Sequence, residues 1–425
     1  MKCVDGWELR SLSALADYIN GFAFKPDDWG NEGLPIIRIE QLKNPDAATD
    51  YFDGRLPPTF VIDDGDLIFS WSASLFLRIW THGRAALNQH LFKVVEREHV
   101  DRLFLRAFIE FYLPELTKAS HGSTMQHITR KELDRFAAPF PVWEAEQSKI
   151  AEVLSTVDRA IEQTDALIAK QHRIKTGLMQ DLLTRGIDEH GNLRSEQTHE
   201  FKDSTLGRIP VEWDVAMLGE VIGPILSGWS PTCDPVPASI GEWAILKTTA
   251  CVWSGYDETE NKRLPAGLQE IPWIEVTVDD ILITRKGPLE RVGVVVHVHK
   301  TRPQLMIPDT VFKMRLTNDS QVIPAFLPLA LGSATVQSDW FQKKIGLADA
   351  QVNLNHSILR STRFPKPKPV EQERVLKVLN ESNRCVYAGR ESLEKLQSLK
   401  TALMQDLLTG NRRVTALLEP DGVRA

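Results

Sequence analysis

The chain has 425 residues, of which 42% are hydrophobic and 25% are charged, and its formal net charge is −7. At roughly 100–200 residues per domain this length allows about two to four domains, and the composition excludes a fully disordered chain and a collagen-like fibre. The acidic balance argues against phosphate contacts over the whole surface, because such contacts need Lys and Arg. Binding to nucleic acid would therefore require a locally basic surface.

The cysteines and the hydropathy pattern indicate a protein of the reducing cytosol. No window approaches the ~18 consecutive apolar residues of a membrane span, and residues 1–5 lack the basic and apolar regions of a signal peptide. No Cys-x-x-Cys pair is present, which argues against a zinc ribbon and a disulfide scaffold. The four scattered cysteines are Cys3, Cys233, Cys251 and Cys385. We expect a cytoplasmic protein without membrane contact.

Residues 1–142 are predicted to form a domain of mixed strands and helices. Short β-type runs at 35–39, 66–71 and 91–95 are separated by turn signals such as Asp53-Gly54, and a helix is predicted at 102–113. The acidic group formed by Asp63, Asp64 and Asp66 precedes a strand. We therefore expect a solvated turn there and not a pair of catalytic carboxylates.

Residues 143–185 are predicted to form one long helix. Residues 146–184 contain no proline, and their apolar positions step by three and four, which is typical of a coiled coil. Pro139 and Pro141 precede the helix, where a missing N–H is tolerated, and Glu146 lies near the positive end of the helix dipole. The predicted seam consists of Ile150, Leu154, Val157, Ile161, Thr164, Ile168, Gln171, Lys175, Leu178 and Leu182.

The second half repeats this plan after a polar, loop-like linker at 186–205. A second mixed domain is predicted at 206–368, with β-type runs at 243–247, 280–284, 293–297 and 311–316. A second long helix follows at 369–410, and residues 411–425 form a C-terminal tail. The predicted seam of this helix consists of Val375, Leu379, Ser382, Val386, Gly389, Leu393, Leu396, Lys400, Leu403 and Leu407.

A direct sequence repeat relates the two halves. The ten residues 175–184 recur almost unchanged at 400–409, and Glu146-Gln147 recurs as Glu371-Gln372, both at an offset of 225. We therefore predict an α+β fold, in which two domains of mixed α/β type are separated by two long antiparallel coiled-coil helices related by a pseudo-two-fold axis. The alternative is that each helix packs separately onto its own domain.

Common catalytic and cofactor signatures are missing from the sequence. It contains no Gly-x-x-x-x-Gly-Lys-Ser/Thr phosphate loop, no Gly-x-Gly-x-x-Gly fingerprint, no Gly-x-Ser-x-Gly elbow and no His-Glu-x-x-His motif. His297 and His299 are two residues apart, so on a strand they would share a face, but such a pair is a weak metal signal. We therefore expect no catalytic, cofactor or metal site in this chain.

Two sequence windows are locally basic in spite of the net charge. Residues 67–95 contain three bases and no acid, and residues 281–302 contain five bases and one acid. Hydroxyl, amide and aromatic groups lie among these bases in Ser70-Trp-Ser72 and Asn88-Gln-His90. This mixture suits contacts to phosphates and base edges, although an ordinary mixed surface would look similar.

These residues resemble the specificity subunit of type I restriction–modification enzymes over about the whole chain. Both halves resemble that family where Glu-Gln opens a helix and Leu-Met-Gln-Asp-Leu-Leu-Thr closes it, and residues 202–213 are similar to its bridge between halves. In the first half the resemblance rests on Gly21-Phe-Ala-Phe24, Pro35-Ile-Ile-Arg38, Gly65-Asp-Leu-Ile-Phe-Ser-Trp71, Leu87-Asn-Gln-His90 and His121-Gly-Ser-Thr124. The second half departs from these front-domain motifs.

The resemblance implies a non-catalytic subunit that reads double-stranded DNA. Each of its two target-recognition domains would read one half of a bipartite site, and the helices would act as a spacer and as the docking surface for two modification subunits. Those partners would carry S-adenosylmethionine and methylate adenine, and a restriction or translocase subunit would use ATP and Mg. No cofactor is implied for this chain itself.

Candidate DNA contacts come from both basic windows and their surroundings. A protein-binding coiled-coil scaffold without DNA recognition is the alternative, and a free-standing hydrolase or methyltransferase is a third possibility for which no site is visible. The candidate residues are Arg38, Ser70, Trp71, Ser72, Arg78 and His90 in the first domain, and Lys247, Arg285, Lys286, Arg291 and Lys300 in the second.

Overall fold

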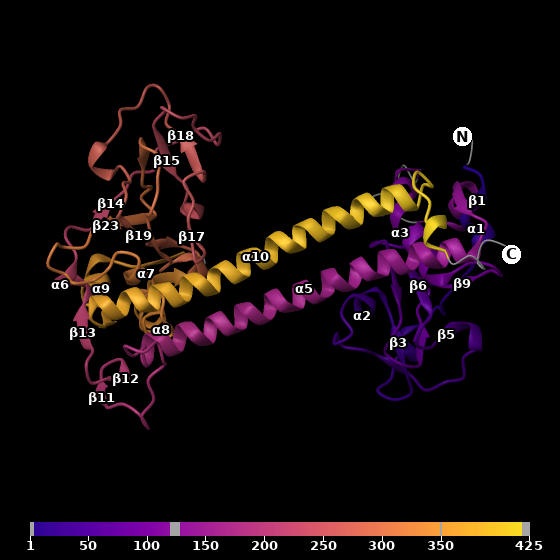
Figure 1. Cartoon of the computed structure of the whole chain (residues 1–425), viewed down its shortest axis with the longest axis horizontal. Helices are drawn as coiled ribbons and strands as arrows, with labels where there is room; N and C mark the ends of the chain where they lie inside the picture. The colour runs from indigo at the N-terminus through magenta and orange to yellow at the C-terminus, as the bar shows by residue number, and fades with distance from the viewer. Residues whose placement is uncertain (1–3, 120–127, 349–350, 419–425) are drawn as a thin grey trace. The chain divides into compact units, whose positions relative to one another are not determined.

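The computed structural model describes residues 4–119, 128–348 and 351–418, which form two compact units. Unit 1 contains residues 1–166 and 389–425, and unit 2 contains residues 167–388 (Figure 1). Each unit holds part of both long helices, α5 (Glu144–Thr184) and α10 (Pro369–Leu407). Cys3, Gln126 and the motif at 121–124 lie outside the described residues.

The β structure of unit 1 consists of two four-stranded sheets and a two-stranded ribbon. The central sheet has the order β2-β9-β6-β7 and the outer sheet the order β4-β3-β8-β5. The central strands are β2 (Ala16–Asn20), β9 (Leu91–Glu96), β6 (Leu67–Ser70) and β7 (Phe76–Ile79). The other strands are β4 (Tyr51–Phe52), β3 (Leu34–Ile37), β8 (Ala85–Leu87) and β5 (Val61–Ile62), with β1 (Trp7–Ser11) paired to β10 (Ala137–Pro141).

Strand β6 is buried on both faces, and its side chains alternate between two cores. Leu67 and Phe69 pack in the core formed with α3, whereas Ile68 packs in the core of the outer sheet. The predicted helix at 102–113 continues to residue 119, through Pro114, because Leu116 still packs in the core. The shorter helices of unit 1 are α1 (Leu12–Leu15), α2 (Ile39–Lys43) and α4 (Arg130–Arg135), and α3 itself is Arg102–Ala119.

Unit 2 repeats this arrangement with a central sheet of order β14-β23-β19-β21 and an outer sheet of order β18-β15-β22. Ile281 and Ile283 of the central strand pack in the core that contains α7, and Leu282 packs in the core of the outer sheet. The strands of the two sheets are β14 (Leu226–Ser227), β23 (Val311–Met314), β19 (Ile281–Thr284), β21 (Val295–His297), β18 (Asn261–Arg263), β15 (Ala244–Leu246) and β22 (Leu305–Met306).

The remaining elements of unit 2 connect and flank these sheets. The predicted loop-like linker at 186–205 contains strand β11 (Phe201–Ser204), which forms a hairpin with β12 (Gly207–Pro210) just beyond it, since four residue pairs meet in antiparallel register. The other strands are β13 (Asp214–Met217), β16 (Cys251–Val252), β17 (Gly255–Tyr256), β20 (Lys286–Gly287), β24 (Ile345–Ala348), β25 (Gln351–Asn353) and β26 (Arg363–Lys366). The helices are α6 (Leu218–Val221), α7 (Phe326–Leu331), α8 (Ala334–Lys343) and α9 (His356–Arg360).

The two long helices pack against each other in antiparallel fashion, which confirms the predicted helix pair. In unit 1, Ile150 and Leu154 share a core with Leu407, and Lys400 Nζ lies 2.6 Å from Asp158 Oδ1. In unit 2, Leu182 of α5 lies in one core with Val375 and Leu379 of α10. Every predicted seam position on both helices is buried or half-buried, so the heptad pattern identified the contact face correctly.

A buried glutamate in the first turn of α10 joins the helices and the linker in unit 2. Both oxygens of Glu371 accept hydrogen bonds from Arg194, which follows the end of α5. Trp213 Nε1 donates to Oε2 at 3.0 Å, and the backbone N–H of Ile187 donates to Oε1 at 2.9 Å. The neighbouring Gln372 is also buried and donates to the carbonyl oxygen of Pro367 at 2.8 Å.

Unit 1 contains the matching interaction at the first turn of α5. Glu146 is buried, and Arg413, which follows the end of α10, donates to Oε1 at 2.5 Å and to Oε2 at 2.7 Å. This hydrogen-bonded pairing raises the pKa of Arg413. Gln147 donates to the carbonyl oxygen of Pro141 at 3.0 Å. The repeated Glu-Gln sequence therefore places a buried carboxylate and a buried amide at the start of each helix.

Removing the carboxylate charge in unit 2 is predicted to destabilise the fold. Glu371→Gln leaves the guanidinium of Arg194, whose side chain is only 5% exposed, paired with the exposed Glu212 and without its buried partner. Losing one partner of a buried ion pair costs up to about 3 kcal/mol of folding free energy. Glu373→Gln is the matched control, because Glu373 lies in the same helical turn and is exposed.

The measurement is urea and thermal unfolding of the full-length chain. Glu371→Gln should lower the unfolding midpoint clearly, and Glu373→Gln should leave it nearly unchanged. Equal midpoints for the two variants would contradict this role of Glu371.

Candidate nucleic-acid interface

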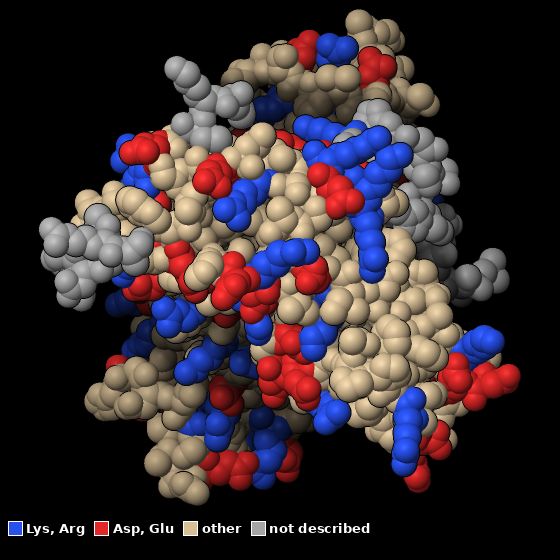
Figure 2. Space-filling view, turned by 90° about the vertical axis from the view of Figure 1, so that its right-hand side faces the viewer, with Lys and Arg blue, Asp and Glu red and all other residues tan. Residues whose placement is uncertain are grey.

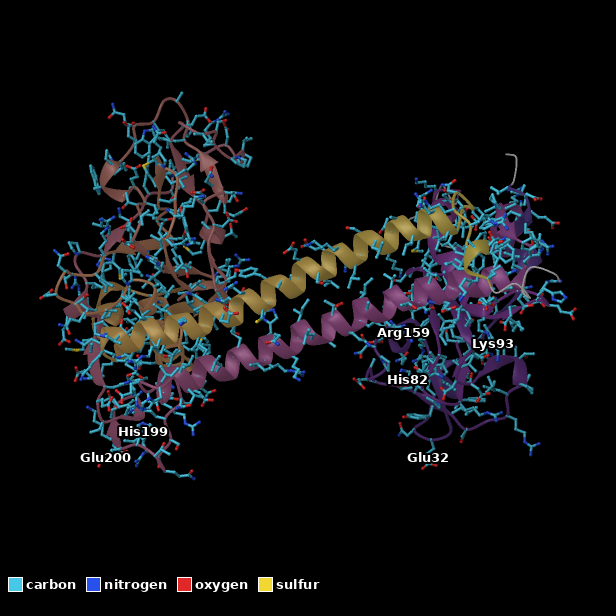
Figure 3. The ribbon with its side chains drawn as sticks, viewed as in Figure 1. Glu32, His82, Lys93, Arg159, His199 and Glu200 are labelled. Atoms are coloured by element: carbon cyan, nitrogen blue, oxygen red, sulfur yellow. The ribbon has the colours of Figure 1, made fainter. Side chains whose placement is uncertain are left out.

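The central sheets of the two units place equivalent residues at equivalent positions. Phe69 of β6 is paired with Phe92, and Ile283 of β19 is paired with Phe312. An acidic residue precedes β6 and another precedes β19, and each forms an ion pair with a lysine on the neighbouring strand. Lys93 Nζ lies 2.7 Å from Asp66 (Lys93 is labelled in Figure 3), and Lys313 Nζ lies 3.7 Å from the fully buried Asp280.

The acidic turn before β6 is solvated as expected at Asp63 and Asp64, which are exposed, but not at Asp66. The Asp66 side chain is only 18% exposed, and besides pairing with Lys93 it accepts the backbone N–H of Asp63 at 2.8 Å. Burial of Lys313 lowers the pKa of its ammonium group, although the facing carboxylate of Asp280 opposes that shift. These ion pairs hold the central strands together, and none of them forms a paired-carboxylate site.

The hydroxyl residue that ends each central strand is buried and holds the following loop. Ser70 is 0% exposed, and its Oγ donates to the carbonyl oxygen of Ser74 at 2.5 Å. Thr284 is 1% exposed, and its Oγ1 donates to the carbonyl oxygen of Arg291 at 2.6 Å. Ser72 is 6% exposed. Two of the candidate contacts, Ser70 and Ser72, thus lie below the surface in this structure.

The next residue after each strand stacks on the matched phenylalanine. The Trp71 ring lies 5.5 Å from the Phe92 ring and 6.0 Å from that of His90. In unit 2 the guanidinium carbon of Arg285 lies 4.8 Å from the centre of the Phe312 ring. Trp71 and Arg285, which were predicted independently as candidate contacts, therefore occupy the same position in the two units.

A second pair of candidates lies at the end of the first strand of each outer sheet. Arg38 precedes α2, and its Nη1 lies 2.6 Å from Asp50, while its guanidinium stacks on the Trp29 ring at 4.9 Å. Lys247 follows β15 in the same way, and its Nζ lies 3.6 Å from Glu260. Both cations are paired with an acid, so their positive charge is partly neutralised in this structure.

The other candidates lie at the surface. Arg78 and His90 are exposed in unit 1, and Lys286, Arg291 and Lys300 are exposed in unit 2. Lys344 holds the loop that carries Arg291, because its Nζ donates to the carbonyl oxygen of Val292 at 2.7 Å. Burial lowers the pKa of Lys344.

The sequence analysis names Gly21 only as part of a motif and does not predict that Gly21 and Gly228 let the end of the first central strand approach the outer sheet of each unit. A Cβ atom on Gly21 would lie 2.3 Å from the carbonyl oxygen of Leu87, and one on Gly228 would lie 2.1 Å from that of Ile307. The residues that follow, Phe22 and Trp229, donate their N–H groups to those same carbonyls. A glycine followed by an aromatic residue in both halves was the available signal.

The surface charge is mixed at the scale of a whole face. On the face of Figure 2, Lys and Arg side chains are interspersed with Asp and Glu. His297 Nε2 lies 3.0 Å from Asp279 Oδ1, and within residues 4–119, 128–348 and 351–418 no group of three potential metal ligands is found. Over the same ranges, no helix is both long and apolar enough to cross a bilayer.

Comparison with known proteins finds similarity to one class of protein. Residues 4–170 match the model of the type I restriction modification DNA specificity domain. The specificity subunit of the type I restriction enzyme EcoEI from Escherichia coli is 37% identical over 47% of this chain and 34% of its own length. Those of EcoBI from Escherichia coli and MjaVIII from Methanocaldococcus jannaschii are 24% and 23% identical over 92% and 98% of this chain, and 81% and 95% of their own lengths.

Solved structures share the fold of the whole chain. The S subunit of the type I restriction–modification system from M. genitalium has a TM-score of 0.55 at 15% identity, covering 96% of this chain and 98% of that chain. A chain from a structure of the complex assembly of a type I system has a TM-score of 0.59 at 14% identity, covering 97% of this chain and 100% of that chain.

The chain is therefore similar in sequence, and over most of its length in fold, to DNA specificity subunits of type I restriction–modification systems. The matched proteins are named as specificity subunits, which is the class that the sequence motifs resemble. The α+β fold with its long helix pair agrees with the structures of such subunits.

Adding a methyl group at the close backbone approach in unit 2 should destabilise that unit. Gly228→Ala places Cβ against two backbone carbonyls that cannot rotate away, and overpacking of this kind costs about 1–3 kcal/mol. Gly223→Ala is the matched control, because its nearest atom would lie 3.9 Å away. Unfolding midpoints of the two variants test this, and equal midpoints would contradict the close approach.

Proposed function

We propose that the chain reads a bipartite site in double-stranded DNA, with each unit recognising one half of the site. The observation that carries this proposal is the pair of equivalent positions after the central strands, which hold Trp71 in unit 1 and Arg285 in unit 2. One backbone arrangement with different side chains suits two readers of different sequences. The major groove of DNA presents the distinct patterns that such readers need.

The proposed DNA contacts follow from what each candidate does in the structure. The exposed bases Arg78, Lys286, Arg291 and Lys300 provide phosphate contacts, and Trp71, His90 and Arg285 lie where base edges would be read. Arg38 and Lys247 contribute further contacts to DNA while each keeps its ion pair with an acidic residue. Ser70 and Ser72 support the reading loop from below, since both are buried.

The long helices would set the spacing between the half-sites and dock two modification subunits. Helices of 41 and 39 residues correspond to about 60 Å at ~1.5 Å per residue.

The partners would bring S-adenosylmethionine for adenine methylation, and restriction or translocase subunits would bring ATP and Mg, so that this chain needs no cofactor. We place the assembly in the cytoplasm. The proposed domain boundaries are 1–142 and 206–368 for the readers, 143–185 and 369–410 for the helices, and 186–205 and 411–425 for the linker and tail.

The proposal is tested by selecting duplexes from a random library with the chain bound to its modification subunits. The expected result is enrichment of two groups of specified base pairs separated by unspecified ones. Enrichment of no sequence would contradict the proposal and favour the alternative of a protein-binding scaffold.

Removing two exposed basic residues from unit 2 should weaken DNA binding, mainly because contacts to phosphates are lost. In Lys286→Ala plus Arg291→Ala, each lost phosphate contact should reduce the slope of log affinity against log salt by about 0.9. The control, Lys262→Ala plus Arg263→Ala, removes two exposed bases from β18 of the same unit. Binding isotherms of the assembled complex at several salt concentrations provide the measurement, and identical slopes for wild type and the first variant would remove these bases from the interface.

A further inference from the structure

We propose that Arg285 reads a guanine in the half-site recognised by unit 2, through the major-groove edge of that base. This inference rests on the proposed function and names the base and the residue. Trp71 is the equivalent residue in unit 1, and it must read its half-site by a different kind of contact.

The backbone of Arg285 is fixed on both sides. Its N–H donates to the carbonyl oxygen of Thr310 at 2.8 Å, and its own carbonyl oxygen accepts the N–H of Leu354 at 2.8 Å. Trp71 is held in the corresponding way, because its carbonyl oxygen accepts the N–H of Ile128 at 3.0 Å. The side chain therefore starts from a defined point at the end of the buried strand β19.

The guanidinium of Arg285 is oriented by stacking and is not neutralised. It lies over Phe312, and its Nε is buried without a hydrogen-bond partner. Among the described residues no carboxylate pairs with it, in contrast to Arg38 with Asp50 and Arg263 with Asp234. Because the Nε is buried, an external acceptor would be met by the terminal Nη groups of this half-buried arginine.

His356 is an ionisable neighbour of Arg285 in the same cluster. Its imidazole ring packs against Phe312, the same residue that Arg285 contacts, and the two ring centres are 4.7 Å apart. Burial, followed by the charges of Arg285 and Arg360, lowers the pKa of His356. The imidazole is therefore mostly neutral at pH 7, and Arg285 is the cation of this cluster.

Guanine is the base that matches a planar, oriented guanidinium. It presents two acceptors, O6 and N7, side by side in the major groove, and arginine binds both at once. Stacking on Phe312 restricts the side chain in advance, so less rotamer freedom is lost on binding. Lysine offers a point charge and no planar fork, so it can replace the charge of Arg285 but not the paired contact.

Unit 1 cannot read guanine in this way, because Trp71 has a single N–H donor and no charge. Its indole lies over Phe92 beside the exposed His90. The two halves of the target should therefore differ at the base pair that faces this position.

The test compares wild type, Arg285→Lys and Trp71→Phe, each assembled with the modification subunits and selected on a random duplex library. Arg263→Lys, a surface arginine of the same unit that is paired with Asp234, is the matched control. Arg285→Lys should lose about 10-fold or more of the preference for one guanine in one half-site, keep the other half-site, and keep most of its affinity at low salt. Trp71→Phe should alter only the other half-site, and Arg263→Lys should alter neither.

Retention of the full guanine preference by Arg285→Lys would overturn this inference, and so would a wild-type half-site without a required guanine. Loss of specificity in the same half-site for Trp71→Phe and Arg285→Lys would also overturn it. Absence of any bipartite motif for the wild type would instead contradict the proposed function, so the two failures are distinguishable. The thermal unfolding midpoint of each variant verifies that the fold is intact.

Discussion

The structure depends on a buried carboxylate in the first turn of each long helix. A charge in that position is tolerated only if it is fully compensated, and the compensation comes from an arginine in the segment that follows the other helix. Glu371 is compensated by Arg194 in unit 2, and Glu146 by Arg413 in unit 1. The two ion pairs therefore join the beginning of one helix to the end of the other within each unit.

This constraint explains how each unit brings distant parts of the chain together. In unit 1, the segment after α10 returns to the N-terminal region, where Gly410 packs against Trp7 and Arg413 donates to the carbonyl oxygen of Asp5. In unit 2, the linker after α5 meets Trp213 and the start of α10. The mixed α/β reader of each unit is built onto this shared base, so its outer side chains can diverge without disturbing it.

The two readers preserve the interactions that hold their strands and vary the residues that face outward. The acid–lysine pair, the buried hydroxyl at the end of the central strand and the phenylalanine of the neighbouring strand are present in both units. The residue that stacks on this phenylalanine changes from Trp71 to Arg285. Shared support with a variable position after the central strand is the arrangement that the proposed reading of two different half-sites would require.

The sequence predicts those features that depend on local periodicity and on the repeat. The heptad pattern correctly gave the contact faces of both helices, and the short β-type runs gave β6, β9, β19, β21 and β23 of the central sheets but missed β2, β7 and β14. The sequence did not show that Ser70 is buried, because a strand buried on both faces has no polar face to mark it, and it gave no sign that Ser72 in the following loop is buried. Nor did it pair Arg194 with Glu371, since the two residues are far apart in the chain.

The most direct test of this account is a double-mutant cycle at each ion pair, with Glu371→Gln and Arg194→Met in unit 2 and Glu146→Gln and Arg413→Met in unit 1. Urea unfolding of the full-length chain provides the free energies. The account predicts strong coupling in both cycles, at least about 1 kcal/mol, as expected for residues in one buried network. Additive effects in either cycle would contradict the claim that these pairs join the helices.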